Sequence, residues 1–221
     1  MTEYDELRAR MVDEQLASRG ISDPRVLEAM EAVPRELFVR DQDRELAYID
    51  AALGIEEGQT ISQPWIVAAI CQALELGPTD EVLEIGTGSG YSTAVIARLA
   101  DSVLSIERLG RLTDSARARL ESLGVENAVL RTGDGSVGAE EAGPFDAIAV
   151  HAAAPKPPPA LLAQLAPGGR LVVPIASGAH EDLTLYRRRP DREGTGPEAF
   201  ERTGIALCRF VPLLGREGYP E

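Results

Sequence analysis

The chain has 221 residues, of which 44% are hydrophobic and 26% are charged. These proportions are ordinary for a soluble globular protein and exclude a fibrous repeat or a largely disordered chain. Acidic residues outnumber basic residues by 36 to 22, and the formal charge of −14 would repel a phosphate backbone. We therefore expect no nucleic-acid substrate.

Membrane and metal-binding classes are also disfavoured by the sequence. Apolar runs such as 66–71 and 171–175 are far shorter than the roughly 20 residues of a membrane-spanning helix. The opening MTEYDELRAR lacks an apolar signal region, so we expect a cytoplasmic protein. Cys71 and Cys208 stand apart, without the paired spacing of a zinc site, which predicts free thiols and no metal.

The first third of the chain has helical patterns. Residues 5–19 place their apolar side chains near one helical face, and the pair Asp23-Pro24 is a helix cap followed by a first-turn proline. That second helix is expected to end near Pro34. After a loop rich in turn residues, the apolar density of 65–76 predicts a buried helix that closes at Gly77-Pro78.

From residue 81 onward, short apolar runs alternate with helical stretches, which is typical of parallel strands joined by crossover helices. The expected strands are 82–85, 102–106, 127–131, 145–150 and 171–175, and the helices between them are 92–99, 112–123 and 159–165. Residues 183–189 and 200–213 flank a loop rich in proline and glycine and predict two antiparallel strands. The predicted fold is α/β, a doubly wound, mostly parallel, Rossmann-like sheet with an N-terminal helical segment and a C-terminal antiparallel hairpin edge.

A glycine-rich loop follows the first predicted strand. The segment EVLEIGTGSGY contains Glu84, Gly86, Gly88 and Gly90 at the end of that strand, which is the ligand end of an open α/β sheet. A dinucleotide fingerprint would need a third glycine where the chain has Tyr91, which disfavours a nicotinamide oxidoreductase. The segment is similar instead to the E-x-G-x-G-x-G loop of methyltransferases that use S-adenosylmethionine.

Two later strand ends carry acidic residues suited to a nucleoside. Glu107 ends the second predicted strand, and its carboxylate can accept hydrogen bonds from both ribose hydroxyls. Asp134 follows the third strand and can accept from an adenine amino group, while Gly135 would let the ring approach. A simple turn role for Asp134 is an equal alternative.

Taken together, these residues resemble the protein-L-isoaspartate (D-aspartate) O-methyltransferase family. The most specific segment is EEGQTISQPWIVA at 56–68, upstream of the first strand. The resemblance extends over nearly the whole chain, from about residue 11 to residue 213. Its other segments are VLEIGTGSGY at 82–91, GDG at 133–135, FDAIAVHAAAP at 145–155, LAPGGRLVVPI at 165–175 and RFVPL at 209–213.

The resemblance implies methyl transfer from S-adenosylmethionine to the free α-carboxylate of L-isoaspartyl residues, and by extension D-aspartyl residues, in damaged proteins and peptides. Attack of the neighbouring backbone nitrogen on the ester then gives a succinimide, which hydrolyses partly to aspartate without an enzyme. A carboxylate is already ionised at pH 7, so no catalytic base is needed. The site has mainly to align the reacting atoms and exclude water.

Residue roles follow from the same resemblance. Ser62 matches the active-site serine and would orient the substrate carboxylate, although capping of the next helix is an alternative role. Thr60, Ile61 and Gln63 would line the cleft beside it. His151 is not assigned as a base. The residues expected to bind the cofactor are Glu84, Gly86, Thr87, Gly88, Gly90, Glu107, Arg108, Asp134 and Gly135.

The expected organisation is a single methyltransferase domain, 1–221. Within it, 1–80 would be a helical cap and substrate loop, 81–176 the cofactor-binding core and 177–221 the β edge. The expected partners are isoaspartyl proteins and peptides, and the expected state is a monomer.

Two alternatives stay open. One is a methyltransferase dedicated to an aspartate of one ribosomal peptide; such relatives tend to carry an added C-terminal region, and this chain stops eight residues after Leu213. The other is a non-catalytic protein that retains the adenosyl pocket.

Overall fold

The central element of the fold is a seven-stranded sheet, seen in a computed structural model that describes residues 2–192 and 194–220. The strand order is β5-β4-β3-β6-β7-β8-β9. Strands β3 to β7 are parallel, and β8 and β9 continue the sheet in antiparallel pairing, which confirms the predicted fold class. The strands are β3 Glu81–Ile85, β4 Ser102–Glu107, β5 Ala128–Thr132, β6 Phe145–Val150, β7 Leu165–Ser177, β8 His180–Arg188 and β9 Phe200–Cys208.

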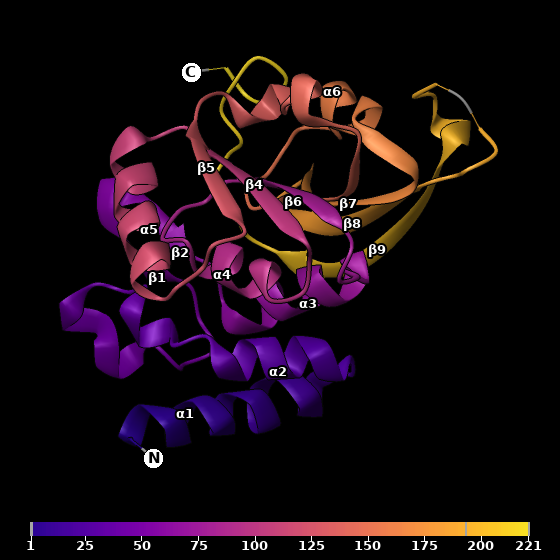
Figure 1. The fold of residues 1–221 in the computed structure, drawn as a ribbon. Coiled ribbons are helices and arrows are strands. Elements are labelled where there is room, and N and C mark those ends of the chain that lie inside the picture. The colour runs from indigo at the N-terminus through magenta and orange to yellow at the C-terminus, as the bar shows by residue number, and fades with distance from the viewer. Residues whose placement is uncertain (1, 193, 221) are drawn as a thin grey trace.

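Helices cover both faces of this sheet (Figure 1). On one face, α3 packs against β6, β7 and β9, while α4 and α5 pack against β4 and β5; α6 packs on β7 from the other face. Helices α1 and α2 form a further layer outside α3 and α4. The α-helices are α1 Glu3–Arg10, α2 Pro24–Ala32, α3 Pro64–Leu74, α4 Tyr91–Ala97, α5 Gly110–Ser122 and α6 Pro159–Ala163.

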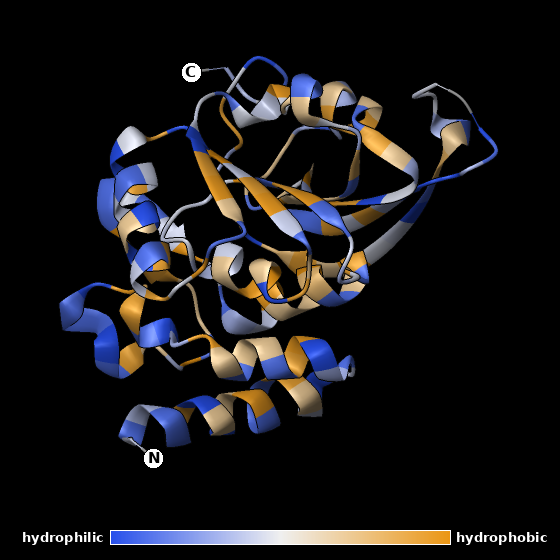
Figure 2. Ribbon diagram, in the orientation of Figure 1, coloured by the Kyte–Doolittle hydropathy of each residue, from blue (hydrophilic) through white to orange (hydrophobic). Residues whose placement is uncertain are grey.

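The hydrophobic core joins the N-terminal layer to the sheet. One buried apolar cluster begins at Met11 and includes side chains of α2, α3 and α4 as well as Leu183 of β8. Figure 2 shows that the central strands and α3 are predominantly hydrophobic, as expected when a parallel strand is covered on both faces. Among the described residues, no helix has both the length and the apolar character needed to cross a bilayer.

The first predicted helix is present but changes its winding along its length. It begins at Glu3, two residues earlier than predicted, because the Thr2 side chain accepts from the Asp5 amide and Asp5 accepts from the Thr2 amide. After Arg10 the chain is π-helical over Met11–Leu16 and 3-10 helical over Ala17–Arg19. The second predicted helix is confirmed, with the Asp23 side chain capping the Arg25 amide.

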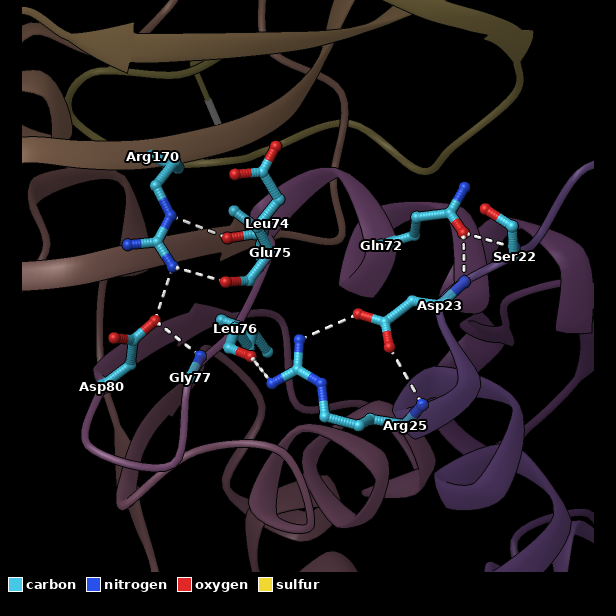
Figure 3. A network of polar contacts seen from close by, with 10 residues as sticks. All are labelled: Ser22, Asp23, Arg25, Gln72, Leu74, Glu75, Leu76, Gly77, Asp80 and Arg170. Atoms are coloured by element: carbon cyan, nitrogen blue, oxygen red, sulfur yellow. Dashed lines mark hydrogen bonds and ion pairs between the residues drawn. The ribbon is translucent and has the colours of Figure 1, made fainter.

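The predicted closure of the third helix at Gly77-Pro78 is wrong. The helix ends at Leu74, and Glu75 adopts a left-handed conformation with φ 49°. The local sequence does not reveal this end, because the side chain that binds the last carbonyls of the helix comes from a distant strand. Arg170 of β7 donates from Nε to the Leu74 carbonyl at 2.7 Å and from Nη2 to the Glu75 carbonyl at 3.1 Å, taking up carbonyls that the helix leaves unpaired (Figure 3).

The C-terminal strands also differ in extent from the prediction. The predicted helix 159–165 stops at Ala163, and β7 already begins at Leu165, earlier than the expected 171. A register shift opposite Phe145 and Ala147 accommodates the glycines in this part of β7. The predicted antiparallel pair is confirmed as β8 and β9, but β9 ends at Cys208, so that 209–213 leave the sheet.

The C-terminal end of α3, which Arg170 contacts, is also tied to the outer layer of α1 and α2. The Gln72 side-chain oxygen accepts from the amides of Ser22 and Asp23 at 2.6 and 3.0 Å, and Arg25 donates to the Leu76 carbonyl at 2.6 Å (Figure 3). Helix α3 is therefore held by polar contacts from β7 on one side and from the start of α2 on the other.

We predict that Arg170→Met lowers the free energy of unfolding by about 2–4 kcal/mol, because it leaves three carbonyls and the carboxylate of Asp80 without their charged donor. The matched control is Arg187→Met, whose ion pair with Glu75 is exposed and should contribute less than about 1 kcal/mol. Urea denaturation measures both values. Equal losses in the two variants would contradict the prediction.

Candidate active site

A cavity lies where the strand order of the sheet reverses. Strand β3 is hydrogen-bonded to β4 on one side and to β6 on the other, so the chain leaves β3 in one direction and returns on the opposite side. Ligands of open α/β sheets bind at such a reversal, beyond the carboxyl ends of the strands. The cavity there has a volume of about 310 Å³. Nine of the predicted site residues line it: Thr60, Ile61, Ser62, Gly86, Thr87, Gly88, Glu107, Arg108 and Gly135.

Two of the glycines that line this cavity are required by the local backbone geometry and packing. Gly86 has a left-handed φ of 93°, and a Cβ at this position would lie 3.4 Å from the Cβ of His151. A Cβ on Gly135 would lie only 2.5 Å from the Cγ2 atom of Ile85. Gly86 is therefore required by its left-handed backbone conformation, and Gly135 by its close packing against Ile85.

Glu107 is fixed in the wall by backbone donors. Its Oε2 atom accepts from the Gly88 amide at 2.9 Å and its Oε1 atom from the Leu109 amide at 3.0 Å. The residue is 7% exposed and lines the cavity. Each carboxylate oxygen has a second lone pair, so the group can still accept hydrogen bonds from a ligand. This is an arrangement suited to a pair of neighbouring hydroxyls.

Glu84 was predicted to contact the cofactor, but its side chain lies beneath the glycine loop and does not line the cavity. It is fully buried, and its Oε2 atom accepts from the hydroxyls of Thr93 and Ser105 at 2.5 and 2.6 Å. The Nε2 atom of His151 lies 3.2 Å from its Oε1 atom. Glu84 therefore holds together the strands and helix that support the loop.

Gly90 and Gln63 also lie outside the cavity wall. A Cβ on Gly90 would meet the Cβ of Ala116 at 3.2 Å, so this glycine allows α4 and α5 to pack closely. The Gln63 side chain points into the N-terminal layer and donates to Asp50 at 2.7 Å. The positions of Gly90 and Gln63 therefore favour a structural role over direct contact with a ligand.

Asp134 is engaged by the C-terminal segment of the chain. Its Oδ1 atom accepts from the amide and hydroxyl of Ser136 at 2.9 and 2.7 Å, and its Oδ2 atom accepts from the Arg216 amide at 2.9 Å. Burial opposes ionisation, but these hydrogen bonds outweigh it and hold the pKa of Asp134 below its usual value. Asp134 does not line the cavity, whereas the adjacent Gly135 does.

Ser62 lines the same cavity as the glycine loop. It follows the two-residue strand β2, Thr60–Ile61, which pairs with β1, Leu53–Gly54. The alternative role of Ser62 as a helix cap is wrong, because α3 begins at Pro64 and its cap position is Gln63. Asp50 instead accepts from the first free amide of the helix, that of Trp65, at 3.4 Å. The Ser62 hydroxyl makes no hydrogen bond with the described residues.

The sequence interpretation missed one wall of the cavity. Residues 210–214 lie across it, anchored by hydrogen bonds of Val211 and Leu213 with Ala153, each 2.8 Å long. The only signal in the sequence is the RFVPL segment, whose apolar residues predict a strand and not a cavity wall. His151 and Tyr91 also line the cavity without having been assigned to it.

Comparison with known proteins identifies the family. The model of the family "Protein-L-isoaspartate(D-aspartate) O-methyltransferase (PCMT)" matches residues 7–218. The chain belongs to this family. A protein-L-isoaspartate O-methyltransferase of Trichlorobacter lovleyi is 50% identical over 219 residues, which cover 99% of this chain and 98% of the relative. The predicted resemblance is thus confirmed.

Comparison of this fold with solved structures supports membership of the protein-L-isoaspartate O-methyltransferase family. One protein-L-isoaspartate O-methyltransferase superposes with a TM-score of 0.83 at 29% identity, covering 96% of this chain and 67% of that one. A putative protein-L-isoaspartate O-methyltransferase from Plasmodium falciparum, in complex with S-adenosyl-L-homocysteine, has a TM-score of 0.78 at 26% identity and covers 94% and 98% of the two chains.

We predict that Asp134→Asn loosens the segment that contains Arg216, because the new amide group turns a donor toward the Arg216 amide. In the wild type, a carboxylate with a lowered pKa stabilises the fold above its ordinary pKa of about 4, and this contribution is lost as the pH falls through the lower folded-state value.

The measurement is the hydrogen-exchange protection of the Arg216 amide. Protection should be reduced in Asp134→Asn at pH 7, whereas the wild type should lose it only on acidification below about pH 4. Asp114→Asn, at an exposed ion pair with Arg117, is the control. Unchanged protection in Asp134→Asn would show that the carboxylate does not hold this segment.

Proposed function

We propose that the chain transfers a methyl group from S-adenosylmethionine to the free α-carboxylate of L-isoaspartyl residues in proteins and peptides. One observation carries the proposal: the glycine loop, Glu107 and Ser62 of the T-I-S-Q-P segment all line a single cavity. The enzyme class is that of the family to which the chain belongs. The bound S-adenosyl-L-homocysteine of the Plasmodium relative supports the same cofactor here.

The cavity fits an adenosyl group by its own chemistry. Glu107 presents fixed carboxylate oxygens for two ribose hydroxyls, and Gly135 and Ile85, packed closely against each other, both line the cavity. Its volume of about 310 Å³ is at the lower end of the range for small-molecule sites. In this arrangement Asp134 supports the adenine side through the backbone at Gly135, and Arg108 completes the wall beside Glu107.

The protein's part in the reaction is to position the reactants and exclude water. When bound, S-adenosylmethionine supplies a methyl group that the positive sulfur makes electrophilic. The substrate carboxylate is ionised at pH 7 and attacks without a base, so the Ser62 hydroxyl has only to donate a hydrogen bond that orients it. Residues 210–214, largely apolar, close the wall on the other side and keep water from the reacting atoms.

The finer assignments stay predictions. These are activity toward D-aspartyl residues, a monomeric state, a cytoplasmic location, the lack of a nucleic-acid substrate and the single domain with its three parts. The formal charge of −14 supports the absence of nucleic acid. The apolar cluster that runs from Met11 to Leu183 supports one domain, since it joins the helical cap to the sheet.

The deciding experiment uses two short peptides that differ only in isoaspartate or aspartate at one position. With labelled S-adenosylmethionine, we expect label on the isoaspartyl peptide alone. Label on the aspartyl peptide would favour a dedicated aspartate methyltransferase. Absence of label on both peptides, together with intact cofactor binding, would favour the non-catalytic alternative.

A second prediction separates the two sides of the cavity. Glu107→Ala should weaken cofactor binding at least about tenfold, because two charge-assisted hydrogen bonds are lost. Ser62→Ala should leave cofactor binding near normal and slow methyl transfer by about tenfold or more through loss of orientation. Calorimetry gives the first quantity and steady-state kinetics the second. Equal cofactor affinity in Glu107→Ala and the wild type, or equal turnover in Ser62→Ala, would disprove the corresponding role.

A further inference from the structure

Arg35 is completely buried and touches both sides of the cavity without lining it. It belongs to the short 3-10 helix Arg35–Leu37 of the N-terminal layer. Its Nη2 atom donates to the Ser62 carbonyl at 2.9 Å, and its guanidinium carbon lies 4.7 Å from the centre of the Tyr91 ring. Ser62 belongs to the substrate side, and Tyr91 follows the last glycine of the cofactor loop.

We propose that Arg35 is a positioning residue that fixes the Ser62 peptide group relative to the glycine loop and so sets where the substrate carboxylate is held. The inference rests on the proposed function, since it concerns the alignment of that substrate. It assigns a role to a side chain that reaches the reactants only through Ser62 and Tyr91.

Burying the charge of Arg35 costs free energy unless well-placed contacts compensate for it. Burial lowers the pKa of Arg35, because desolvation disfavours the charged form. Burial also raises the pKa of Tyr91 to about 12, so the phenol is neutral at pH 7, and the carboxylate whose charge favours the ionised guanidinium is that of Asp50. The Nη1 atom has no hydrogen-bond partner among the described residues. The guanidinium is thus fixed by two backbone carbonyls and an aromatic ring while one buried donor stays unpaired, which favours a role in orientation.

The contacts of Arg35 restrict motion on both sides. The Ser62 carbonyl belongs to the peptide plane between Ser62 and Gln63, so a hydrogen bond to it restricts the rotation that would turn the Ser62 hydroxyl away. The Nε atom donates to the Ala47 carbonyl at 2.7 Å, which fixes the guanidinium plane itself. Phe38 packs edge-on against Tyr91, with 5.6 Å between the two ring centres, and holds the ring on which the guanidinium lies.

Loss of this arrangement should affect alignment more than cofactor binding. Glu107 and Gly88 are hydrogen-bonded to each other, and the contacts of Arg35 described above involve neither of them. A misplacement of about 1 Å in a reacting group can cost about 10²-fold in rate. The expected signature of an Arg35 variant is therefore a fall in kcat/KM for the peptide at nearly constant cofactor affinity.

The test compares Arg35→Met with Arg170→Met in the full-length protein. Arg170 is the matched control, because its guanidinium also donates to backbone carbonyls of a helix end but lies at the far end of α3 (Figure 3). Three quantities are measured below the melting temperatures of the variants: kcat/KM for the isoaspartyl peptide, the Kd for S-adenosylhomocysteine, and the hydrogen exchange of a peptic fragment spanning residues 58–66.

For Arg35→Met we expect kcat/KM to fall by about 10- to 100-fold, Kd to stay within about threefold, and exchange of 58–66 to accelerate. Arg170→Met should leave all three near the wild-type values. Arg35→Lys keeps the charge but not the planar fork, so its kcat/KM should be intermediate, and it replaces Arg35→Met if that variant does not fold.

Two results would overturn the proposal. One is that neither Arg35 variant differs from Arg170→Met in kcat/KM and in exchange of 58–66. The other is that both Arg35 variants lose cofactor affinity as much as they lose kcat/KM. If the wild type itself fails to methylate the isoaspartyl peptide, the proposed function fails, and the exchange of 58–66 alone decides whether Arg35 fixes this segment.

Discussion

The site depends on the reversal of strand order between β3 and β6. Because the connections from these neighbouring strands lead away to opposite sides, no loop crosses the sheet edge between them. Gly86, Glu107, Gly135 and His151 follow or end different parallel strands, yet all line the cavity at that edge. In the proposed function this edge is the half of the site that would face the nucleoside, and the remaining walls are added to it from outside the parallel core.

Those added walls have different supports. The loop with Ser62 is held by the N-terminal layer, where Arg35 binds its carbonyl and Asp50 receives the first free amide of α3. The opposite wall, 210–214, is held by main-chain bonds to Ala153. A glycine loop beside an acidic strand end is shared by many enzymes that bind nucleosides. In the proposed function, these two walls are therefore the parts of the site assigned to recognition of the isoaspartyl peptide.

The sequence predicted those features that local pattern controls. Apolar runs of the right length located the parallel strands, because such strands are buried on both faces, and glycines located the ligand loop. Glu84 could not be placed in this way: only the fold shows that its carboxylate faces Thr93 and Ser105 under the loop. The end of α3 was missed for a similar reason, since Arg170 follows it by about a hundred residues and leaves no local mark.

The C-terminal wall shows a second limit. An apolar run at 209–213 reads as strand, but Pro212 lacks an amide donor, and the segment leaves β9 to cross the cavity. Its partners are equally remote, since the Arg216 amide binds Asp134 across 82 residues of sequence. Long-range hydrogen bonds of this kind decide which side chains remain available to a ligand, and they are invisible to a reading of spacing.

This wall has a consequence for the order in which the molecule matures. The chain just beyond the wall is anchored as well. The Ser136 hydroxyl oxygen accepts a hydrogen bond from the Glu217 amide, and the Glu217 carboxylate accepts from the Ala160 amide at the start of α6. A chain that ends at Cys208 contains all seven strands of the described sheet but lacks residues 210–214 of the cavity lining. Synthesis therefore completes the strands before the last wall of the cavity, and a protease that cuts behind β9 would remove that wall while leaving every strand in the chain.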